Sequence, residues 1–237
     1  MRALILVPAY NEAGSLPAVV GEIRVLAPGI DILVVDDGSE DGTPSVVEGL
    51  DVQWLRLPVR QGVGTAVRTG LRYARSHGYD AVVRLDGDGQ HPAALIAPLL
   101  DPLIRGTADV AIGSRYALHP RPREIRFARR LLHYGLGRVL SLLTGRLVTD
   151  PSSGLWAFGP RAVEILADHH PSGYPEPELY LFLHRNGLRT IEVPVEMRER
   201  LAGETSLTLH RTISALGRLL VLLAVVPLRR PTNGGRR

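Results

Sequence analysis

Residues 81–92 read AVVRLDGDGQHP, an apolar run closed by two carboxylates one residue apart, Asp86 and Asp88. A short run of this kind, ended by turn residues, is typical of a strand buried on both faces of a parallel sheet. Ligands of open parallel sheets bind outside the carboxyl ends of the strands. We therefore expect both carboxylates at a sheet edge that a ligand can reach.

The charge of this pair limits what the ligand can be. Two ionised carboxylates about 4 Å apart repel by roughly 4 kcal/mol at an effective dielectric of about 20, so a cation or a shared proton must compensate them. Asp86, Asp88 and the amide oxygen of Gln90 predict a divalent metal site that can bridge to a diphosphate. The alternative is a strand-terminating turn, because Asp and Gly dominate turns.

Two earlier segments repeat the pattern. ALILV at 3–7 runs into PAYNE, and DILVV at 31–35 runs into Asp-Asp-Gly-Ser. Because parallel strands end at one edge of a sheet, Glu12 and Asp37 should lie near Asp86. Taken singly, Glu12 or Asp37 is better explained by helix capping or by a solvated turn, and it is the repetition of the pattern that favours a shared ligand site.

Apolar periodicity and turn residues predict alternating strands and helices. Strands are expected near 3–8, 31–36, 52–57, 81–86, 109–114, 154–158 and 189–195. Helices are expected at about 15–26, 43–49, 62–77, 92–105, 123–144, 160–168 and 175–186. This alternation predicts an α/β fold with a mostly parallel sheet and helices on both faces.

Composition sets bounds on the class of protein. With 237 residues, 45% of them hydrophobic, the chain can bury one sizeable core, so one main domain is expected. The absence of cysteine excludes disulfides, thiolate catalysis and zinc–thiolate sites. The apolar run at the amino end is too short for a signal peptide, which predicts a cytoplasmic protein.

Positive charge is concentrated in one segment. Between Arg115 and Val148 there are eight arginines and one acidic residue, a balance of +7 in a chain whose total is +4. This predicts a site for a phosphate or for an acidic membrane surface. A solvated helix face is the alternative, which we favour for Arg138 and Arg146. Nucleic acid is a poor candidate, because aromatic residues make up 5% of the chain and do not interleave with the arginines.

The carboxyl-terminal part, 207–237, carries a second cue for a membrane. Its longest uninterrupted apolar run, 219–226, is far shorter than the ~20 residues of a spanning helix. Leucine and isoleucine at three- and four-residue steps, followed by arginines, predict an amphipathic helix in the membrane interface. The alternatives are packing on the core, on a second subunit in a homo-oligomer, or on a membrane-protein partner.

Taken together, these motifs resemble those of the family 2 glycosyltransferases over about residues 1–206. Within that family the chain is most similar to the polyprenol-phosphate sugar transferases of the dolichol-phosphate mannosyltransferase type. The matching segments, in the order of the family, are PAYNE at 8–12, VVDDGSEDGT at 34–43, DGDGQHP at 86–92, GSR at 113–115, TDPSSGLWAF at 149–158 and EVPVEMRERLAG at 192–203. The resemblance implies a single Rossmann-like domain of the GT-A type over 1–206, which transfers sugars from nucleoside diphosphates.

The resemblance also implies roles for individual residues. The nucleotide would be held by Pro8, Tyr10, Glu12, Asp37 and Asp86. Mg²⁺ or Mn²⁺ on its diphosphate would be held by Asp86, Asp88 and Gln90. Because related enzymes carry arginines at these positions, Arg115 and Arg129 are expected to bind an acceptor phosphate.

The implied reaction is the inverting transfer of a hexose from a UDP- or GDP-sugar to a polyprenyl phosphate at the cytoplasmic membrane face, in cell-envelope synthesis. The metal at Asp88, helped by Arg198 or Arg200, would stabilise the leaving diphosphate. The family often has a lysine in a G-x-S-K segment that this chain lacks, which leaves these two arginines as the cations. A phosphate acceptor is already ionised, whereas a sugar hydroxyl would require a base, with Asp150 or Glu178 as candidates. For Asp150 a turn or capping role is the alternative.

Other functions remain as hypotheses. The same site could act on a saccharide acceptor in polysaccharide or glycolipid synthesis, or belong to a non-catalytic nucleotide-sugar-binding protein. A nucleotidyltransferase would normally show a glycine-rich phosphate loop after the first strand, which PAYNE does not match. An aspartyl phosphatase would have its Asp-x-Asp after the first strand of its fold, not after the fourth.

Overall fold

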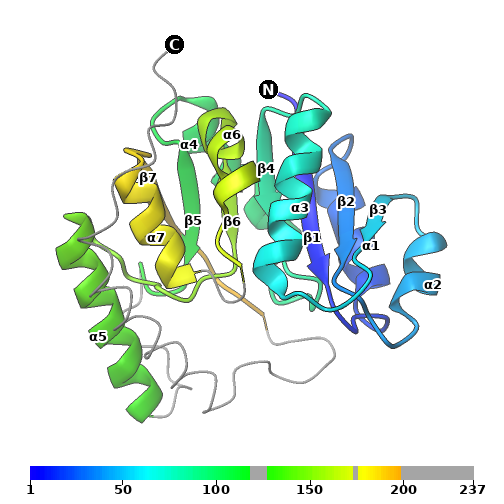
Figure 1. Cartoon of the computed structure of the whole chain (residues 1–237), viewed down its shortest axis with the longest axis horizontal. Coiled ribbons are helices and arrows are strands. Elements are labelled where there is room, and N and C mark those ends of the chain that lie inside the picture. Colours follow the sequence, from blue (N-terminus) through cyan, green and yellow to red (C-terminus); the bar gives the residue numbers. More distant parts are fainter. Residues whose placement is uncertain (118–126, 173–175, 199–237) are drawn as a thin grey trace.

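The computed structural model of the chain describes residues 1–117, 127–172 and 176–198, with backbone alone at 127–132 and at residue 176. These residues form one seven-stranded sheet with the order β3-β2-β1-β4-β6-β5-β7 (Figure 1). The strands are β1 (Ala3–Ala9), β2 (Asp31–Asp36), β3 (Gln53–Arg56), β4 (Ala81–Arg84), β5 (Val110–Ser114), β6 (Trp156–Phe158) and β7 (Thr190–Pro194).

Helices alternate with the strands, as the sequence predicts. They are α1 (Leu16–Leu26), α2 (Thr43–Glu48), α3 (Val63–Ser76), α4 (Ile96–Ile104, preceded by a 3-10 turn at Ala93–Leu95), α5 (Phe127–Thr144), α6 (Pro160–His169) and α7 (Glu176–Arg185). A proline in the first turn begins α1, α2 and α6, where its missing N–H has no helical partner to lose. Each strand and helix lies within a few residues of its predicted range. The amphipathic helix and the domain boundary expected beyond residue 206 lie outside the described residues.

The parallel strands bring the acidic strand ends together. β1 runs parallel to both β2 and β4, so these three strands end at one edge, the lower edge in Figure 1. β6 is the exception to the parallel order, because it lies antiparallel between β4 and β5. The sheet is therefore mostly parallel, which confirms the predicted fold class.

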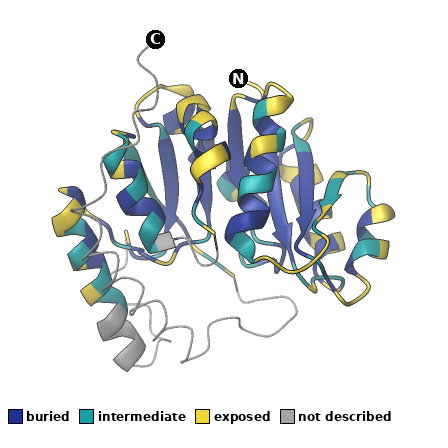
Figure 2. Cartoon of the chain, in the orientation of Figure 1, coloured by how far each residue is buried: buried dark blue, intermediate teal, exposed yellow. Residues whose placement is uncertain are grey.

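Two apolar layers sandwich the sheet. One packs α3, α6 and α7 on one face, and the other packs α1 and α4 on the opposite face. Alternate strand residues supply the two layers, with Val82 in the first and Val83 in the second. Figure 2 shows the strands buried and the outer faces of the helices exposed. At Gly70 a Cβ would lie 2.3 Å from a methyl of Leu6, so glycine lets α3 approach β1 closely.

Helix α5 leaves large apolar side chains in solvent. Leu142 on α5 is 84% exposed, and Leu147 in the loop after it is 79% exposed. Within the described ranges, no helix combines the length and the hydropathy needed to cross a bilayer.

Candidate active site

The turns after β1 and β2 are joined by hydrogen bonds. The backbone N–H of Asp37 donates to the carbonyl of Ala9 (2.8 Å), and that of Asn11 donates to Ser39 Oγ (2.9 Å). The N–H of Glu12 donates to Thr43 Oγ1 at the start of α2 (2.8 Å). The PAYNE turn and the Asp-Asp-Gly-Ser turn therefore form one surface at the edge of the sheet.

Asp37 and Tyr10 border the loop that leads into α3. The buried carboxylate of Asp37 accepts the backbone N–H groups of Gln61 and Gly62, both at 2.8 Å. Gly62 has φ of 96°, a conformation that favours glycine. The guanidinium of Arg60 lies 3.9 Å from the centroid of the Tyr10 ring, a cation–π contact. Two predicted nucleotide-binding residues thus border one loop, which Asp37 holds in shape.

The Asp-x-Asp turn passes directly beside the PAYNE turn. A Cβ at Gly87 would lie 3.4 Å from the carbonyl oxygen of Pro8 and 3.5 Å from Cγ of Glu12. The side chain of Glu12 accepts a hydrogen bond from Ser15 Oγ at 2.7 Å. The predicted nucleotide residues Pro8 and Glu12 are therefore neighbours of the predicted metal ligands.

Local hydrogen bonds shape the Asp-x-Asp turn itself. Asp88 is 4% exposed, and its Oδ1 accepts the backbone N–H of Gln90 (3.0 Å). The backbone N–H of Asp86 donates to Nδ1 of His91 (3.0 Å), so that ring nitrogen is an acceptor. Burial lowers the pKa of His91, although Asp86 and Asp88 oppose the shift. A neutral imidazole thus stabilises the turn by accepting the backbone N–H of Asp86.

Asp86 has a cation beside it within the protein. Nε and Nη2 of Arg84 donate to its Oδ1 at 3.3 and 3.1 Å. The other oxygen of the carboxylate, Oδ2, lies against Gly154, where a Cβ would come within 2.5 Å of it. The segment that contains Gly154 therefore packs against the Asp-x-Asp turn.

The donor atoms at this turn suit a hard divalent cation. Carboxylate and amide oxygens, such as those of Asp86, Asp88 and Gln90, are the ligands that Mg²⁺ and Mn²⁺ prefer. In the part of the chain that the structure describes, no three His, Asp or Glu side chains come close enough to hold a metal. The residues fit Mg²⁺ or Mn²⁺ on the condition that further oxygen ligands come from a bound molecule, such as a diphosphate.

A second charged group, the pair of Arg115 and Asp150, follows the end of β5. Nε and Nη2 of Arg115 donate to the two oxygens of the fully buried Asp150 carboxylate at 2.6 and 2.7 Å. Nη2 also donates to Ser152 Oγ at 2.9 Å. Burial alone would lower the pKa of Arg115, but the hydrogen bonds and charge of Asp150 outweigh it and raise that pKa. Arg115 therefore stays charged, with its fork held in one orientation.

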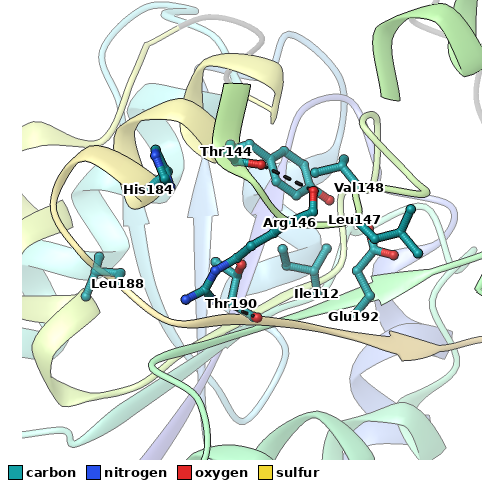
Figure 3. Close-up of a pocket in the computed structure, with 10 residues that line it drawn as sticks. Ile112, Thr144, Arg146, Leu147, Val148, His184, Leu188, Thr190 and Glu192 are labelled. Atoms are coloured by element: carbon teal, nitrogen blue, oxygen red, sulfur yellow. Dashed lines mark hydrogen bonds between the residues drawn. The ribbon is translucent and has the colours of Figure 1, made fainter. Parts of the chain in front are cut away.

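Side chains from α7 and β7 contact the backbone around Asp150. The hydroxyl of Tyr180 donates to its carbonyl oxygen at 3.0 Å. Glu192 on β7 accepts the N–H of Thr149 at 2.8 Å and also the hydroxyl of Thr149. Burial raises the pKa of Glu192, partly offset by these hydrogen bonds. Glu192 also lines a cavity of about 40 Å³ together with residues of the segment 144–148, as the close-up in Figure 3 shows for the lining residues. The loop that carries Asp150 is thus anchored to an edge strand.

One loop connects the two charged groups. After Asp150 the chain reaches Ser153, whose hydroxyl donates to the carbonyl of Gly113 at 2.6 Å. The next residue, Gly154, lies against Asp86. The segment 149–154 therefore contacts the Asp-x-Asp turn at one end and holds Arg115 at the other.

Not every predicted residue joins these groups. The backbone N–H of Arg198 donates to the carbonyl of Gln90 (3.0 Å), but its guanidinium donates to Glu22 at 2.7 Å. Glu178 is half-buried on α7. Arg129 lies on α5 where the structure describes backbone alone, and Arg200 lies outside the described residues.

Three contributors were missed by reasoning from the sequence: Arg84, His91 and Glu192. Arg84 carried a signal, because a charged residue inside an apolar strand must be paired when it is buried. Glu192 carried none, since its partner Thr149 lies 43 positions earlier in the chain. His91 lies inside a recognised motif, but its acceptor role became visible only with the turn in three dimensions.

Comparison with known proteins gives a consistent result. The sequence model described as "Glycosyl transferase family 2" matches residues 4–165. The undecaprenyl-phosphate mannosyltransferase of Micrococcus luteus is 31% identical over 216 residues, which cover 88% of each chain. The polyprenol monophosphomannose synthase of Mycolicibacterium smegmatis is 32% identical over 216 residues, which cover 87% of this chain and 81% of that one.

A solved structure matches the fold over nearly the whole chain. Glucosyl-3-phosphoglycerate synthase from Mycobacterium tuberculosis, in complex with Mn²⁺, UDP and glucosyl-3-phosphoglycerate, aligns with a TM-score of 0.69 and 21% identity. The alignment covers 98% of this chain and 81% of that one. At this level of identity the match concerns the fold, and it confirms the GT-A-like α/β architecture.

Proposed function

This chain belongs to glycosyl transferase family 2, and from this premise we propose that it catalyses the inverting transfer of a hexose from a UDP- or GDP-sugar to a polyprenyl phosphate. The observation that carries the proposal is the segment 149–154, which contacts Asp86 through Gly154 and holds Arg115 through Asp150. A donor diphosphate at the Asp-x-Asp turn and an acceptor phosphate at Arg115 would then be neighbours. The named functions of the two mannosyl-transferring relatives support this choice of acceptor.

The donor half of the reaction would use the turns after β1, β2 and β4. Tyr10 and Asp37 would bind the nucleoside, and Asp86, Asp88 and Gln90 would hold Mg²⁺ or Mn²⁺. When bound, the cation would neutralise the negative charge that develops on the departing diphosphate. Solved structures of the same fold in complex with UDP and Mn²⁺ or Mg²⁺ support this expectation.

The acceptor half would depend on Arg115. A guanidinium fork held by a buried carboxylate is well suited to bind phosphate oxygens, and two of its nitrogens already have fixed directions. Since an acceptor phosphate is ionised at neutral pH, it needs position rather than deprotonation. The engagement of both Asp150 oxygens by Arg115 favours a positioning role for Asp150 over the role of general base.

Contact with a membrane surface would bring the acceptor to this site. The exposed Leu142 and Leu147 lie beside Arg138 and Arg146 in sequence, a combination of apolar and basic groups suited to an anionic lipid surface. Within the proposal the enzyme acts peripherally at the cytoplasmic face of the membrane. Arg129 would then contribute to the acceptor site from α5.

The test is nucleotide release from a panel of UDP- and GDP-sugars with Mg²⁺ or Mn²⁺, with and without a short polyprenyl phosphate. Release that depends on the lipid phosphate is expected, and Arg115→Met should reduce it strongly. Arg105→Met alters an exposed arginine that follows α4 and pairs with Asp101, and it should not reduce this release. Release that requires a saccharide acceptor would replace the proposal with a sugar-acceptor transferase, and no release with any acceptor would favour a binding protein.

A further inference from the structure

Arg84 is a buried cation in the central strand of the sheet. It is the last residue of β4, and its side chain is 4% exposed. Its neighbours on the adjoining strands are Leu6 on β1 and Trp156 on β6, both fully buried. Arginine is almost never so buried unless it is paired, so its environment must provide an anion.

The anion is a predicted metal ligand. Nε and Nη2 of Arg84 both donate to Oδ1 of Asp86, at 3.3 and 3.1 Å. Gly154 closes over the pair, because a Cβ there would lie 2.5 Å from Asp86 Oδ2 and 3.4 Å from Nη2 of Arg84. The packing leaves the guanidinium little room to move away from the carboxylate.

The histidines near Arg84 do not add positive charge. Burial lowers the pKa of His170 to about 3, and the charge of Arg84 contributes to that shift. At His91 the backbone N–H of Asp86 donates to Nδ1 (3.0 Å), so this ring nitrogen carries no proton of its own. Both rings are thus neutral at pH 7, so the balance of Arg84, Asp86 and Asp88 is one positive against two negative charges.

This balance weakens the attraction for a cation. A pair of carboxylates at a metal site normally relies on the metal to relieve their repulsion. Here Asp86 is compensated before any metal arrives, and among the described residues no three His, Asp or Glu side chains are arranged to hold a metal ion. The missing negative charge and the missing oxygen ligands can both come from a nucleoside diphosphate.

We propose that Arg84 is an internal counter-ion of Asp86, which keeps the Asp-x-Asp turn in its binding shape without metal and makes tight binding of the divalent cation depend on the nucleotide. The inference rests on the proposed function in one respect, the assignment of Asp86 and Asp88 as metal ligands. It goes further by naming a positioning residue in the strand and by predicting the coupling between two ligands.

The experiment is a Mn²⁺ titration of the full chain followed by electron paramagnetic resonance, which counts free Mn²⁺, with no nucleotide, with UDP and with GDP. For the unaltered protein, affinity should rise about tenfold or more with one of the nucleotides. Arg84→Met keeps an unbranched apolar stem but removes the charged guanidinium, and should bind Mn²⁺ alone about tenfold more tightly. Arg84→Lys keeps the charge and should behave like the unaltered protein.

Two further variants separate the possible failures. Arg84→Met combined with Asp86→Asn removes both charges and should not bind Mn²⁺ more tightly than the unaltered protein. If Asp88→Ala leaves nucleotide-dependent Mn²⁺ binding unchanged, the metal assignment of the proposed function has failed. If Asp88→Ala abolishes binding but a folded Arg84→Met binds Mn²⁺ alone no more tightly, the role of Arg84 is overturned. Should Arg84→Met not fold, equal Mn²⁺ affinity of the unaltered protein with and without nucleotide would overturn it.

Discussion

Replacing Asp150 by asparagine tests whether this carboxylate positions Arg115 or acts as a base. Asparagine keeps the shape of the side chain and one acceptor oxygen, but it removes the negative charge and one branch of the contact with the Arg115 fork. The turn around Asp150 keeps its backbone contacts with Tyr180 and Glu192. The change is therefore confined to the contacts of the carboxylate, which are the ion pair with Arg115 and longer hydrogen bonds from the backbone N–H of Arg115 (3.2 Å) and from Ser152 (3.4 Å).

The size of the effect follows from burial. Breaking a buried ion pair by removing one partner costs about 3–5 kcal/mol, because the other charge is left uncompensated. Asp150 is fully buried, but the side chain of Arg115 is 33% exposed, so water can recover part of that loss. We expect a loss of about 2–3 kcal/mol in the free energy of unfolding. For a domain of this size this lowers the unfolding midpoint by roughly 4–12 °C.

The functional assay is transfer kinetics at saturating donor with varied polyprenyl phosphate. If Asp150 fixes the orientation of Arg115, the KM for the acceptor should rise about tenfold to hundredfold, the value of a hydrogen bond to a charged group. The matched control is Asp168→Asn, which breaks a two-pronged contact with Arg75 on the protein surface. It should change neither the acceptor KM nor, appreciably, the unfolding midpoint.

The opposite pattern would refute this reasoning. A general base contributes about 10²- to 10⁴-fold to the rate, so its loss lowers kcat and leaves the acceptor KM in place. If Asp150→Asn shows that pattern with an unchanged unfolding midpoint, Asp150 is a base and the acceptor is a hydroxyl.

Three further predictions concern other parts of the structure. Gly154→Ala puts a methyl 2.5 Å from Asp86 Oδ2 and should cost about 1–3 kcal/mol of stability, with weaker nucleotide-dependent Mn²⁺ binding in calorimetry. The folded pKa of His170, about 3, lies below its value of about 6.5 in the unfolded chain. The unfolded state therefore binds the proton at a higher pH than the folded state does. The free energy of unfolding should fall as the pH drops from about 6.5 toward 3, by up to roughly 1.4 kcal/mol per pH unit. In urea titrations, His170→Gln should flatten that slope. Leu142→Asp and Leu147→Asp should each reduce binding to anionic vesicles about tenfold in sedimentation, because both side chains are exposed.

Each of these predictions has a control within the same chain. At Gly49 a Cβ would lie 3.5 Å from its nearest neighbour, so Gly49→Ala should be tolerated. His169→Gln, at an exposed neighbour of His170, should leave the slope against pH unchanged. Ile104→Asp alters a 64% exposed side chain on α4 and should not affect vesicle binding. If a control behaves like its test variant, the corresponding prediction is wrong.

Much of the fold was readable along the chain. The strand Ala3–Ala9 is a continuous apolar run closed by a turn, and such a run has few ways to bury itself other than inside a parallel sheet. The same pattern at β2 and β4 predicts that Asp37 and Asp86 lie at one edge of the sheet. The antiparallel insertion of β6 between β4 and β5 was not readable, because strand order depends on how distant layers pack.

The local pattern of residues predicts the positions of strands and helices along the chain, because burial imposes a period of its own on each kind of element, and it predicts the residues of the donor site at the strand ends. Which charges meet is set by the three-dimensional packing. Arg115 pairs with Asp150 across 35 positions, and Glu192 holds Thr149 across 43. Even the ion pair of Arg84 and Asp86, two positions apart, was not predictable from the sequence. It depends on the turn after β4, which brings both side chains against Gly154. Electrostatic partners are chosen by distance and desolvation in three dimensions, and neither quantity is written in the local pattern of residues.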